Sequence, residues 1–381
     1  MWWFLLVSCG SSPEPVPVAS TADTAPLRSV DTGHTSHTND TIGTTTVPTG
    51  DDALPQRLGL LTLNLHCLKL DGTRHPDHEA RWAAIAAEVA AGEVDVLALQ
   101  EVCVRDDLDA LGSLEAALEA ATGDAWEGAF AFAHVAWEGT SDEADEGVAL
   151  LSRVGLGAPT ELGYVDPGAL RRVGLFATLD DGTTVSTVHF EVSDTAERES
   201  QARQTASQLL AAAGSLDVVL AGDLNDREGS PTHGAFGSMG YLDVSDELAL
   251  PRIDYAFAHR GGRWRAGAQA LWFRGADAVS DHPGVFVELV ASPPDEVLLT
   301  RVVAQVDVGF GHTLAVRGDA APLSWERGWW AWPVAADRWE LVLTEVSGSF
   351  AFKTLVDDQT WQVGDDVSAD AGQEVLIRPT Y

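Results

Sequence analysis

The sequence predicts an α+β protein in which a two-sheet sandwich covered by helices is followed by a small all-β sandwich. Predicted strands outnumber predicted helices, and the helices fall between pairs of strands, which is typical of two packed sheets with helices on their outer faces. Two consecutive prolines, Pro293 and Pro294, indicate a boundary. Beyond them, residues 297–381 consist of short strand-like runs separated by turn dipeptides, which predicts the second sandwich.

Three helices are predicted from their capping residues and apolar spacing. Asp77 can cap a helix with one apolar face, and Gly92 ends it. Two further helices are predicted over residues 108–121 and 196–213, each of which is followed by a glycine.

The strands are predicted as apolar runs that end in polar residues or turns. They cover residues 58–65, 94–101, 147–151, 174–179, 184–189, 218–221, 253–258 and 284–290. The run 276–279 is also interpreted as strand-like, with the strand continuing beyond it.

Length and charge restrict the function classes. A chain of 381 residues with 45% apolar content can bury one large core and a smaller second one. Its formal net charge of −35 argues against a stable nucleic-acid complex, because binding along a phosphate backbone needs clustered Lys and Arg. We expect an acidic, soluble monomer, although an enzyme that contacts a polyanion only briefly can also be acidic.

The first residues resemble an export signal. Residues 1–9 are apolar and end in Leu-Val-Ser-Cys, which resembles the bacterial lipobox. This resemblance implies lipidation of Cys9 and a membrane anchor in the bacterial cell envelope, and plain secretion is the alternative. Residues 10–55 are rich in Ser, Thr and Pro and are interpreted as a disordered linker.

Two further cysteines, Cys67 and Cys103, remain if Cys9 carries lipid. Both follow predicted strands whose ends meet at one rim of a sheet, and an even pair in an oxidising compartment favours a disulfide. The alternative is two buried thiols that pack as small apolar groups.

Polar side chains, namely amides, carboxylates and imidazoles, follow the predicted strands. Hydrolysis of a phosphodiester needs oxygen ligands for a divalent cation, an activated water and donors for the phosphoryl oxygens. Any one of these residues alone could be a surface charge or a turn former. The candidates are Asn64, Glu101, His189, Asp223, Asn225, Asp281 and His282.

Seven short motifs in order resemble the endonuclease/exonuclease/phosphatase (DNase I-like) superfamily. The resemblance covers residues 58–290 and implies a four-layer α/β/β/α sandwich, here assigned to residues 56–291. The motifs are Thr62-Leu-Asn64, Leu99-Gln-Glu-Val102, Gly147–Arg153, Thr187-Val-His189, Gly222-Asp-Leu-Asn225, Arg252-Ile-Asp-Tyr255 and Ser280-Asp-His282.

The resemblance implies a role for each candidate. Glu101 would be the main metal ligand, assisted by Asn64 and Asp281, with Mg²⁺ the usual ion and Mn²⁺ or Ca²⁺ the alternatives. His282 would act on the phosphate or as a base, and Asp223 would orient or deprotonate the attacking water.

The remaining residues would act as donors or as supports. By the same resemblance, His189 and Asn225 would donate to the phosphoryl oxygens, and Asp254 would fix the tautomer of a histidine. Glu146 would support His189 in the same way, with Glu143 and Asp145 as alternatives.

The substrate stays open, because the motifs define a reaction and not a leaving group. The loop 69–78 offers Lys69 and Arg74 as contacts to a phosphate or head group. We expect an exported Mg²⁺-dependent phosphoesterase acting on a lipid head group or small phosphodiester. The alternatives are an extracellular DNase I-like endonuclease and a catalytically idle surface glucan-binding protein.

Three motifs in the C-terminal region are Leu323-Ser-Trp-Glu-Arg-Gly328, Phe350–Asp358 and Trp361-Gln-Val-Gly-Asp365. They resemble the starch-binding carbohydrate-binding modules, which are immunoglobulin-like sandwiches, over residues 305–379. The resemblance implies an α-glucan site formed by Trp325, Lys353 and Trp361. Asp365-Asp366 stand where the family usually has Asn. The alternative is that the tryptophans fill the core, which we favour for Trp332 and Trp339.

Overall fold

The structure is a computed structural model that describes residues 56–165 and 168–381. The predicted signal with Cys9 and the linker 10–55 lie outside the described residues. Among the described helices, none combines the length and the apolar character needed to cross a membrane.

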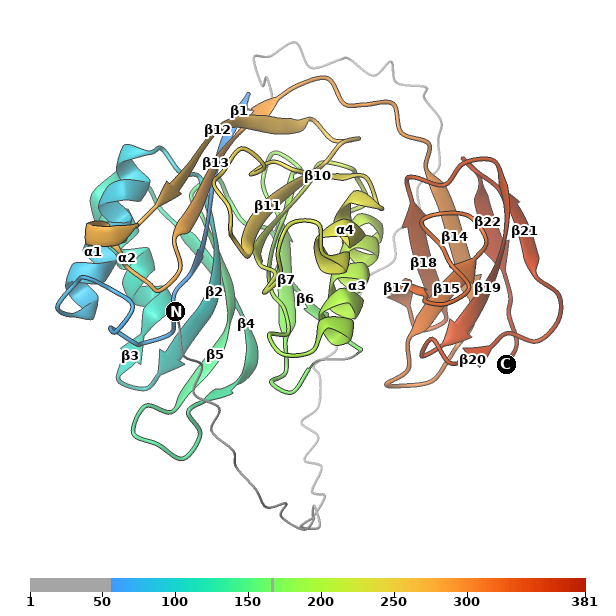
Figure 1. The fold of residues 1–381 in the computed structure, drawn as a ribbon, viewed down its shortest axis with the longest axis horizontal. Coiled ribbons are helices and arrows are strands. Elements are labelled where there is room, and N and C mark those ends of the chain that lie inside the picture. Colours follow the sequence, from blue (N-terminus) through green and yellow to red (C-terminus); the bar gives the residue numbers. More distant parts are fainter. Residues whose placement is uncertain (1–55, 166–167) are drawn as a thin grey trace, which may run out of the picture. The chain divides into compact units, whose positions relative to one another are not determined.

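Two mixed sheets form the first sandwich (Figure 1). In the first sheet the order is β12-β13-β1-β2-β5-β4, and β3 pairs with β2. Its strands are β1 (Arg57–Asn64), β2 (Val96–Arg105), β3 (Leu108–Asp109), β4 (Glu127–Ala136), β5 (Ala144–Ser152), β12 (Trp264–Trp272) and β13 (Gly284–Ala291).

The second sheet has the order β10-β11-β9-β8-β7-β6. Its strands are β6 (Thr160–Gly163), β7 (Val173–Thr178), β8 (Thr184–His189), β9 (Val218–Asp223), β10 (Tyr241–Asp243) and β11 (Asp254–His259).

Alternating side chains place three apolar layers around these sheets. Leu60 of β1 points into the cluster between the sheets, which also contains Ala221 of β9. Its neighbour Leu61 points outward against Ile85 of α1 (His78–Ala91). On the other side, Leu220 of β9 packs into the cluster that contains α3. The four-layer α/β/β/α sandwich is confirmed.

The helices begin and end where the sequence predicts. The Asp77 carboxylate accepts from the Ala80 amide at the start of α1, and Gly92 follows its end. Glycines in the left-handed conformation, at φ values of 77° and 67°, end the next two helices. These are α2 (Ala110–Thr122) and α3 (Thr195–Ala213); the short helix α4 (Pro231–Gly237) was not predicted.

The prediction of a strand over residues 276–279 is wrong. The segment begins with a 3-10 turn, η1 (Gly275–Asp277), and Val279 is in a loop. Alanine and aspartate have low strand propensity, so the run does not outweigh turn formation. Asp281 and His282 therefore come directly before a strand, β13, and not after one.

The C-terminal region is all-β, as predicted, and consists of two small sheets. One has the order β17-β18-β14-β22, the other β16-β15-β19-β20 with β21 paired to β19. Their strands are β14 (Thr300–Gln305), β15 (Leu314–Gly318), β16 (Trp329–Trp330), β17 (Trp332–Ala335), β18 (Arg338–Leu343), β19 (Ser349–Val356), β20 (Thr360–Trp361), β21 (Val367–Asp370) and β22 (Glu374–Ile377).

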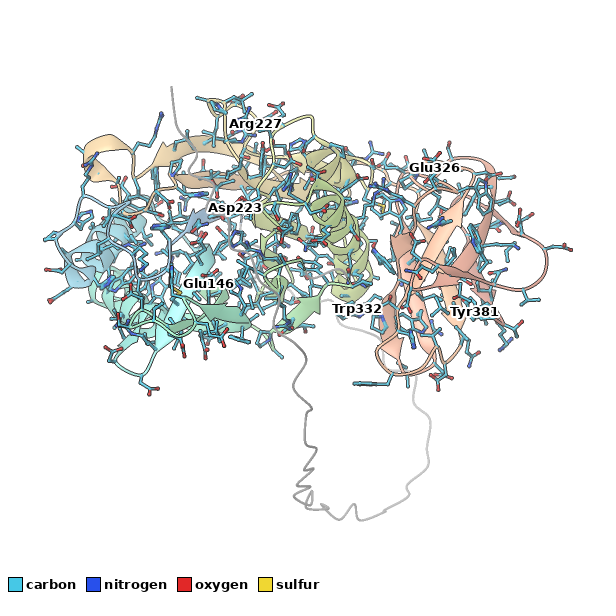
Figure 2. All side chains as sticks on the ribbon, turned by 60° about the horizontal axis from the view of Figure 1, so that its bottom comes forward. Glu146, Asp223, Arg227, Glu326, Trp332 and Tyr381 are labelled. Atoms are coloured by element: carbon cyan, nitrogen blue, oxygen red, sulfur yellow. A yellow bond between two sulfur atoms is a disulfide. The ribbon has the colours of Figure 1, made fainter. Side chains whose placement is uncertain are left out.

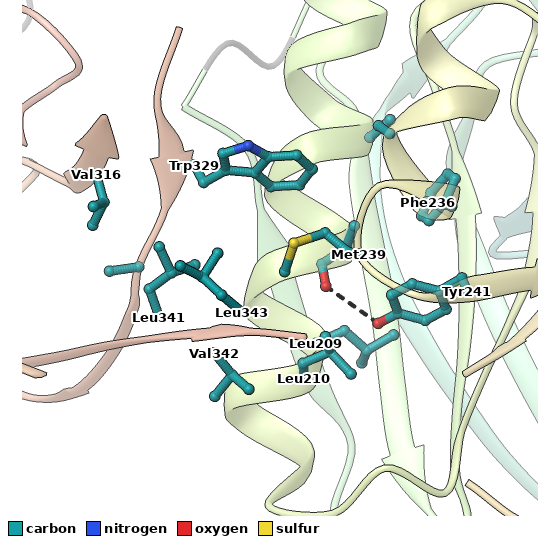
Figure 3. Close-up of a cluster of buried hydrophobic side chains, with 14 of the residues drawn as sticks. Leu209, Leu210, Phe236, Met239, Tyr241, Val316, Trp329, Leu341, Val342 and Leu343 are labelled. Atoms are coloured by element: carbon teal, nitrogen blue, oxygen red, sulfur yellow. Dashed lines mark hydrogen bonds between the residues drawn. The ribbon is translucent and has the colours of Figure 1, made fainter. Parts of the chain in front are cut away.

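Helix α3 belongs to one apolar cluster with this second sandwich (Figure 3). Leu209 and Leu210 of α3 are in the same cluster as Trp329 and Leu341. The Ser207 hydroxyl and the Gln208 amide donate to carbonyls of residues 330 and 331, at 2.7 and 3.1 Å. Both sandwiches therefore lie within one compact unit.

Candidate active site

The ends of strands from both sheets meet at one edge of the first sandwich. His189 ends β8 and Asp223 ends β9, and the two are register partners in parallel strands. Asp254 begins β11 opposite Asp223. Asn64 at the end of β1 bridges the sheets, because its Nδ2 donates to Asp223 Oδ2 at 3.2 Å. Figure 2 shows Asp223 within this sandwich.

Glu101 is turned into this edge by a bulge in β2. The pairing between β2 and β5 shifts between Leu99 and Val102, and Glu101 has a φ of 47°. A non-glycine residue in this conformation is strained and persists only where its surroundings hold it. The Glu101 carbonyl accepts from the Cys67 amide at 2.9 Å, and its carboxylate accepts from Asn64 Nδ2 at 2.9 Å.

Asp223 is almost completely buried, with 1% of its surface exposed. Its Oδ1 accepts from the Asn225 amide at 2.7 Å. Burial and the charge of Asp254 raise the pKa of Asp223 to about 7, against the lowering effect of His282. Asp223 is therefore able to take up a proton near neutral pH.

His282 and Asp254 form a hydrogen-bonded pair. His282 Nδ1 donates to Asp254 Oδ2 at 3.0 Å, so Nε2 is the nitrogen left to face a substrate. Burial lowers the pKa of His282, but the hydrogen bond and charge of Asp254, with the charges of Asp223 and Asp281, raise it to about 10. The expected role of Asp254, to fix a histidine's tautomer, matches this geometry.

His189 is held by an arginine. Arg172 Nη1 donates to His189 Nδ1 at 3.0 Å, and since a guanidinium cannot accept, Nδ1 must be the acceptor. Burial, followed by the charge of Arg172, lowers the pKa of His189 well below its usual value. The neutral ring therefore carries its proton on Nε2, which lies 3.7 Å from Asp223 Oδ2.

The expectation that Glu146 supports His189 needs correction. Glu146 lies 3.6 Å from His134 Nε2, while Arg172 occupies the place behind His189. Glu146, Arg172 and His189 nevertheless line one small cavity. Burial and then the charge of Glu101 raise the pKa of Glu146 to about 7, against the lowering effect of Arg172.

Two carboxylates at this edge lie near the same histidine, His66. Glu101 Oε2 and Asp281 Oδ2 lie 3.8 and 3.3 Å from the same atom, His66 Nδ1, although they come from different parts of the chain. Carboxylate oxygens are the ligands that Mg²⁺ takes in proteins. Among the described residues, however, Glu101 and Asp281 do not belong to a group of three or more side chains whose ligand atoms lie within 4.8 Å of one another. Asn64 presents its amide nitrogen to Glu101, and its oxygen accepts from the His66 amide at 2.9 Å. Asn64 thus orients Glu101, and only the second lone pair of its oxygen is left for an ion.

One group of side chains at this edge does have ligand atoms in close proximity. Atoms of Asp223, Asp254 and His282 lie within 4.8 Å of one another. Because His282 Nδ1 already donates to Asp254, we interpret this group as the proton-transfer part of the site.

Buried cross-links hold the loops that carry these residues. Cys67 and Cys103 form a disulfide, as one of the two alternatives predicted. Arg81 of α1 is completely buried and donates to the carbonyls of Leu65, Cys67 and Val279. It therefore ties the loop after Asn64 to the loop that leads to His282.

Sequence reasoning missed four residues of the site: His66, Arg81, His134 and Arg172. His66 could have been found from its place two residues after Asn64. Arg172 directly precedes β7 in an Arg-Arg pair, but nothing local distinguishes it from Arg171, which pairs with Glu161 at 2.5 Å. All nine predicted residues of the hydrolytic site lie at this edge.

The predicted sugar-binding residues lie separately, in the second sandwich. Trp325 and Trp361 are partly exposed, with ring centroids 6.2 Å apart. Lys353 Nζ donates to the Gly364 carbonyl at 2.8 Å and lies 3.7 Å from Asp366. Trp339 is buried and Trp332 half-buried, the latter against Phe176 of β7.

This fold, with carboxylates and histidines gathered where strands of two packed sheets end, defines a class of phosphoester-hydrolysing sandwich proteins. The chain belongs to the endonuclease/exonuclease/phosphatase family, whose family model matches residues 61–282. Members of this family hydrolyse phosphoesters and generally use divalent metal ions. No curated protein matches the chain.

Solved structures with a similar fold have low sequence identity. A family protein from Beutenbergia cavernae is 17% identical, with a TM-score of 0.49, and the match covers 83% of this chain and 100% of that chain. One from Leptotrichia buccalis is 17% identical, with a TM-score of 0.46 and coverage of 61% and 99%. A mannosyl-6-phosphatase from Bacteroides thetaiotaomicron is 15% identical, with a TM-score of 0.45 and coverage of 61% and 99%.

Proposed function

We propose that this protein is an exported, Mg²⁺-dependent phosphoesterase that hydrolyses a phosphodiester by in-line attack of an activated water. The observation that carries the proposal is that the Asp254–His282 pair and the buried Asp223 lie at the same edge as the carboxylates Glu101 and Asp281, which both approach His66. Isolated carboxylates are common on surfaces, but a buried carboxylate of raised pKa beside a fixed histidine is a typical acid–base arrangement.

Each residue has a distinct part in the proposed reaction. Asp223, with its pKa raised to about 7, accepts the proton of the attacking water. His282, protonated at neutral pH, donates from Nε2 to a phosphoryl oxygen. His189 Nε2 provides a further donor. Asn225 Nδ2 donates one hydrogen to the Phe190 carbonyl, and its second hydrogen is left for a phosphoryl oxygen.

Glu101 and Asp281 would hold the Mg²⁺ ion, with Asn64 orienting Glu101. When bound, the ion supplies positive charge that stabilises the phosphoryl oxygens as negative charge develops on them. Mn²⁺ or Ca²⁺ would be alternative occupants of the same oxygen ligands.

The substrate class that we favour is a lipid head group or a small phosphodiester, because the net charge of −35 disfavours binding along a nucleic-acid backbone. An extracellular DNase-like activity is the rival. Turnover of sphingomyelin, inositol phosphates, plasmid DNA and RNA with Mg²⁺ and with EDTA would decide between them. If intact protein loaded with Mg²⁺ hydrolysed none of these substrates, the result would count against the proposal. The same would be true if a His282→Ala variant were as active as the wild type.

We propose export and lipid anchoring at Cys9, on the basis of the apolar start and the Leu-Val-Ser-Cys sequence. Metabolic labelling with a tagged fatty acid tests it. If the full chain is labelled and a Cys9→Ala variant is not, the result supports the anchor. Equal labelling of both proteins would contradict it.

A second function, binding of an α-glucan by the C-terminal sandwich, is favoured by two neighbouring exposed indoles. Soluble starch in a native gel should retard the full chain, and Trp325→Ala or Trp361→Ala should restore its mobility. A Trp332→Ala variant is the control. Equal mobility with and without starch would remove the sugar site.

A further inference from the structure

A polar pocket of about 430 Å³ adjoins the catalytic His282. Three segments form it: the loop 71–74, the stretch 273–278 and the loop 280–283 that carries Asp281 and His282. Its size falls in the range of small-molecule sites. Because His282 is one of its lining residues, a substrate bound at the catalytic edge would reach into it.

Two arginines in this pocket, Arg74 and Arg274, are exposed and have no carboxylate partner among the described residues. That is unusual here, because the chain has 58 acidic and only 23 Lys and Arg side chains. Of the other described cations, only Arg227 and Arg378 are both exposed and without an ion pair. Arg227, labelled in Figure 2, follows the Asp223–Asn225 loop, and Arg378 is in the second sandwich.

The backbone that carries Arg74 is fixed to the opposite wall. The Arg74 amide donates to the Ala278 carbonyl at 2.7 Å, and the Thr73 hydroxyl donates to the same oxygen at 3.0 Å. Gly72 packs so closely on Asp281 that a Cβ there would lie 2.5 Å from the Asp281 nitrogen. The pocket is therefore built into the fold, since its walls are joined by hydrogen bonds and close packing.

The two carboxylates of the pocket face a different partner. Asp71 and Asp281 lie 3.1 and 3.3 Å from the two ring nitrogens of His66. Each carboxylate is thus oriented towards His66. Arg74 Nε donates to the Gly275 carbonyl at 3.3 Å, which leaves the two terminal nitrogens of Arg74 and the guanidinium of Arg274 available to a ligand. Guanidinium groups bind phosphate oxygens with two parallel hydrogen bonds, so the pair fits an anionic group better than a neutral or cationic one.

We infer that this pocket binds a second phosphate of the substrate, and that the substrate is a small molecule with a phosphate in addition to the one that is hydrolysed. The inference rests on the proposed function and narrows it. A choline head group, which is cationic, would be repelled by Arg74 and Arg274, whereas a phosphorylated sugar or polyol would be held by them.

The test compares two substrates with the same scissile group, the p-nitrophenyl ester of thymidine 5′-phosphate with and without a 3′-phosphate. In the wild type we expect kcat/KM to be about tenfold higher for the compound with two phosphates, mainly through KM. Arg74→Ala and Arg274→Ala should reduce this ratio towards one. Arg274→Lys should keep part of it, and Arg378→Ala, the exposed control, should leave it unchanged.

The outcomes separate the pocket from the catalytic proposal. Hydrolysis of both compounds with a ratio that the arginine variants do not change would overturn the pocket inference alone. Hydrolysis of neither would count against the proposed function, and calorimetric titration with thymidine 3′,5′-bisphosphate would then still test the pocket. If the wild type and Arg274→Ala bound this bisphosphate with equal affinity, the pocket inference would be overturned. If kcat/KM were higher for a thymidine tetranucleotide than for the bisphosphate compound, the assignment of the substrate as a small molecule would be overturned.

Discussion

At the scale of single residues, the histidines of the site differ because their partners differ. Burial lowers the pKa of both His282 and His189. The carboxylates that face His282 nevertheless raise its pKa to about 10, whereas Arg172 lowers the pKa of His189 further, so that His189 is neutral. His134 lies beside Glu146, but burial and the charge of Arg172 lower its pKa. Three rings of one residue type therefore have different proton-donating capacity in one edge of the fold.

The role of Asp254 predicts that replacing it with asparagine strongly reduces the rate of hydrolysis. Asp254→Asn keeps the shape but can donate to His282 Nδ1, which would favour the wrong tautomer. We expect kcat/KM to fall by about two to four orders of magnitude, with an unchanged melting temperature within a few degrees. Asp357→Asn is the control, because Asp357 lies 2.6 Å from His312 in the second sandwich, away from the predicted catalytic residues. Equal losses in both variants would contradict the assignment.

Arg172 should act by positioning His189. Arg172→Met removes the donor to Nδ1, and we expect kcat to fall about 10- to 100-fold while KM changes little. Arg172→Gln retains an N–H donor and should recover part of the rate. The two variants compared in steady-state kinetics provide the measurement. Identical kcat values in both, or a loss confined to KM, would refute the positioning role.

Single residues of the site could be predicted where a motif surrounds them, and not otherwise. Asp223 and His189 were predictable, since each ends a buried strand and stands in one of the seven motifs. Arg172 and His66 were not, because their roles depend on neighbours that only the folded chain supplies. The error for Glu146 has the same origin: its place near the site was correct, but its partner is set by how β4 and β7 approach β5.

At the scale of elements, strands that bury large apolar side chains were predictable from the sequence. A strand that buries small side chains and exposes a large apolar one was not. Strand β4 buries alanines, including Ala131, and exposes 40% of Phe132, so its pattern does not mark a buried face. Helix α3 was predicted, but its packing against the second sandwich was not. Its buried polar residues Ser207 and Gln208 make sense only with the second sandwich present.

The disulfide should stabilise the loop that carries the metal ligands. Cys67 and Cys103 are 36 residues apart, for which chain entropy alone gives about 3–4 kcal/mol. We expect the double variant Cys67→Ala/Cys103→Ala to lose about this free energy of unfolding in urea. It should also bind Mg²⁺ more weakly, since the Cys67 amide donates to Glu101.

The pairing itself can be checked in the unmodified chain. Maleimide labelling of both cysteines in denatured, unreduced protein would show that no bridge forms. An unchanged unfolding free energy in the double variant would show that the bridge does not stabilise the fold.

At the scale of the whole molecule, His259 links the two sandwiches and should make stability depend on pH. It is 1% exposed, and its Nε2 lies 3.0 Å from the Met239 carbonyl and 3.4 Å from Thr344 Oγ1 of the second sandwich. Burial lowers the pKa of His259 to about 4, from an ordinary value of 6.5. Because the unfolded chain takes up the proton first, stability is full above pH 6.5 and falls as the pH drops towards 4.

The loss can amount to about 3 kcal/mol at most. Urea unfolding at a series of pH values measures it, and a His259→Gln variant should show a flatter dependence over the same range. The same slope in both proteins would rule out His259 as its source.

The central claim is that residues far apart in the chain form one metal-dependent hydrolytic site. The most direct measurement is the rate of hydrolysis of bis(p-nitrophenyl) phosphate by the wild type and by Glu101→Gln, each with Mg²⁺ and with EDTA. We predict turnover in the wild type that EDTA abolishes and Mg²⁺ restores, and a folded variant with about 1% of that rate or less. Turnover that persists in EDTA, or a variant as active as the wild type, would contradict it.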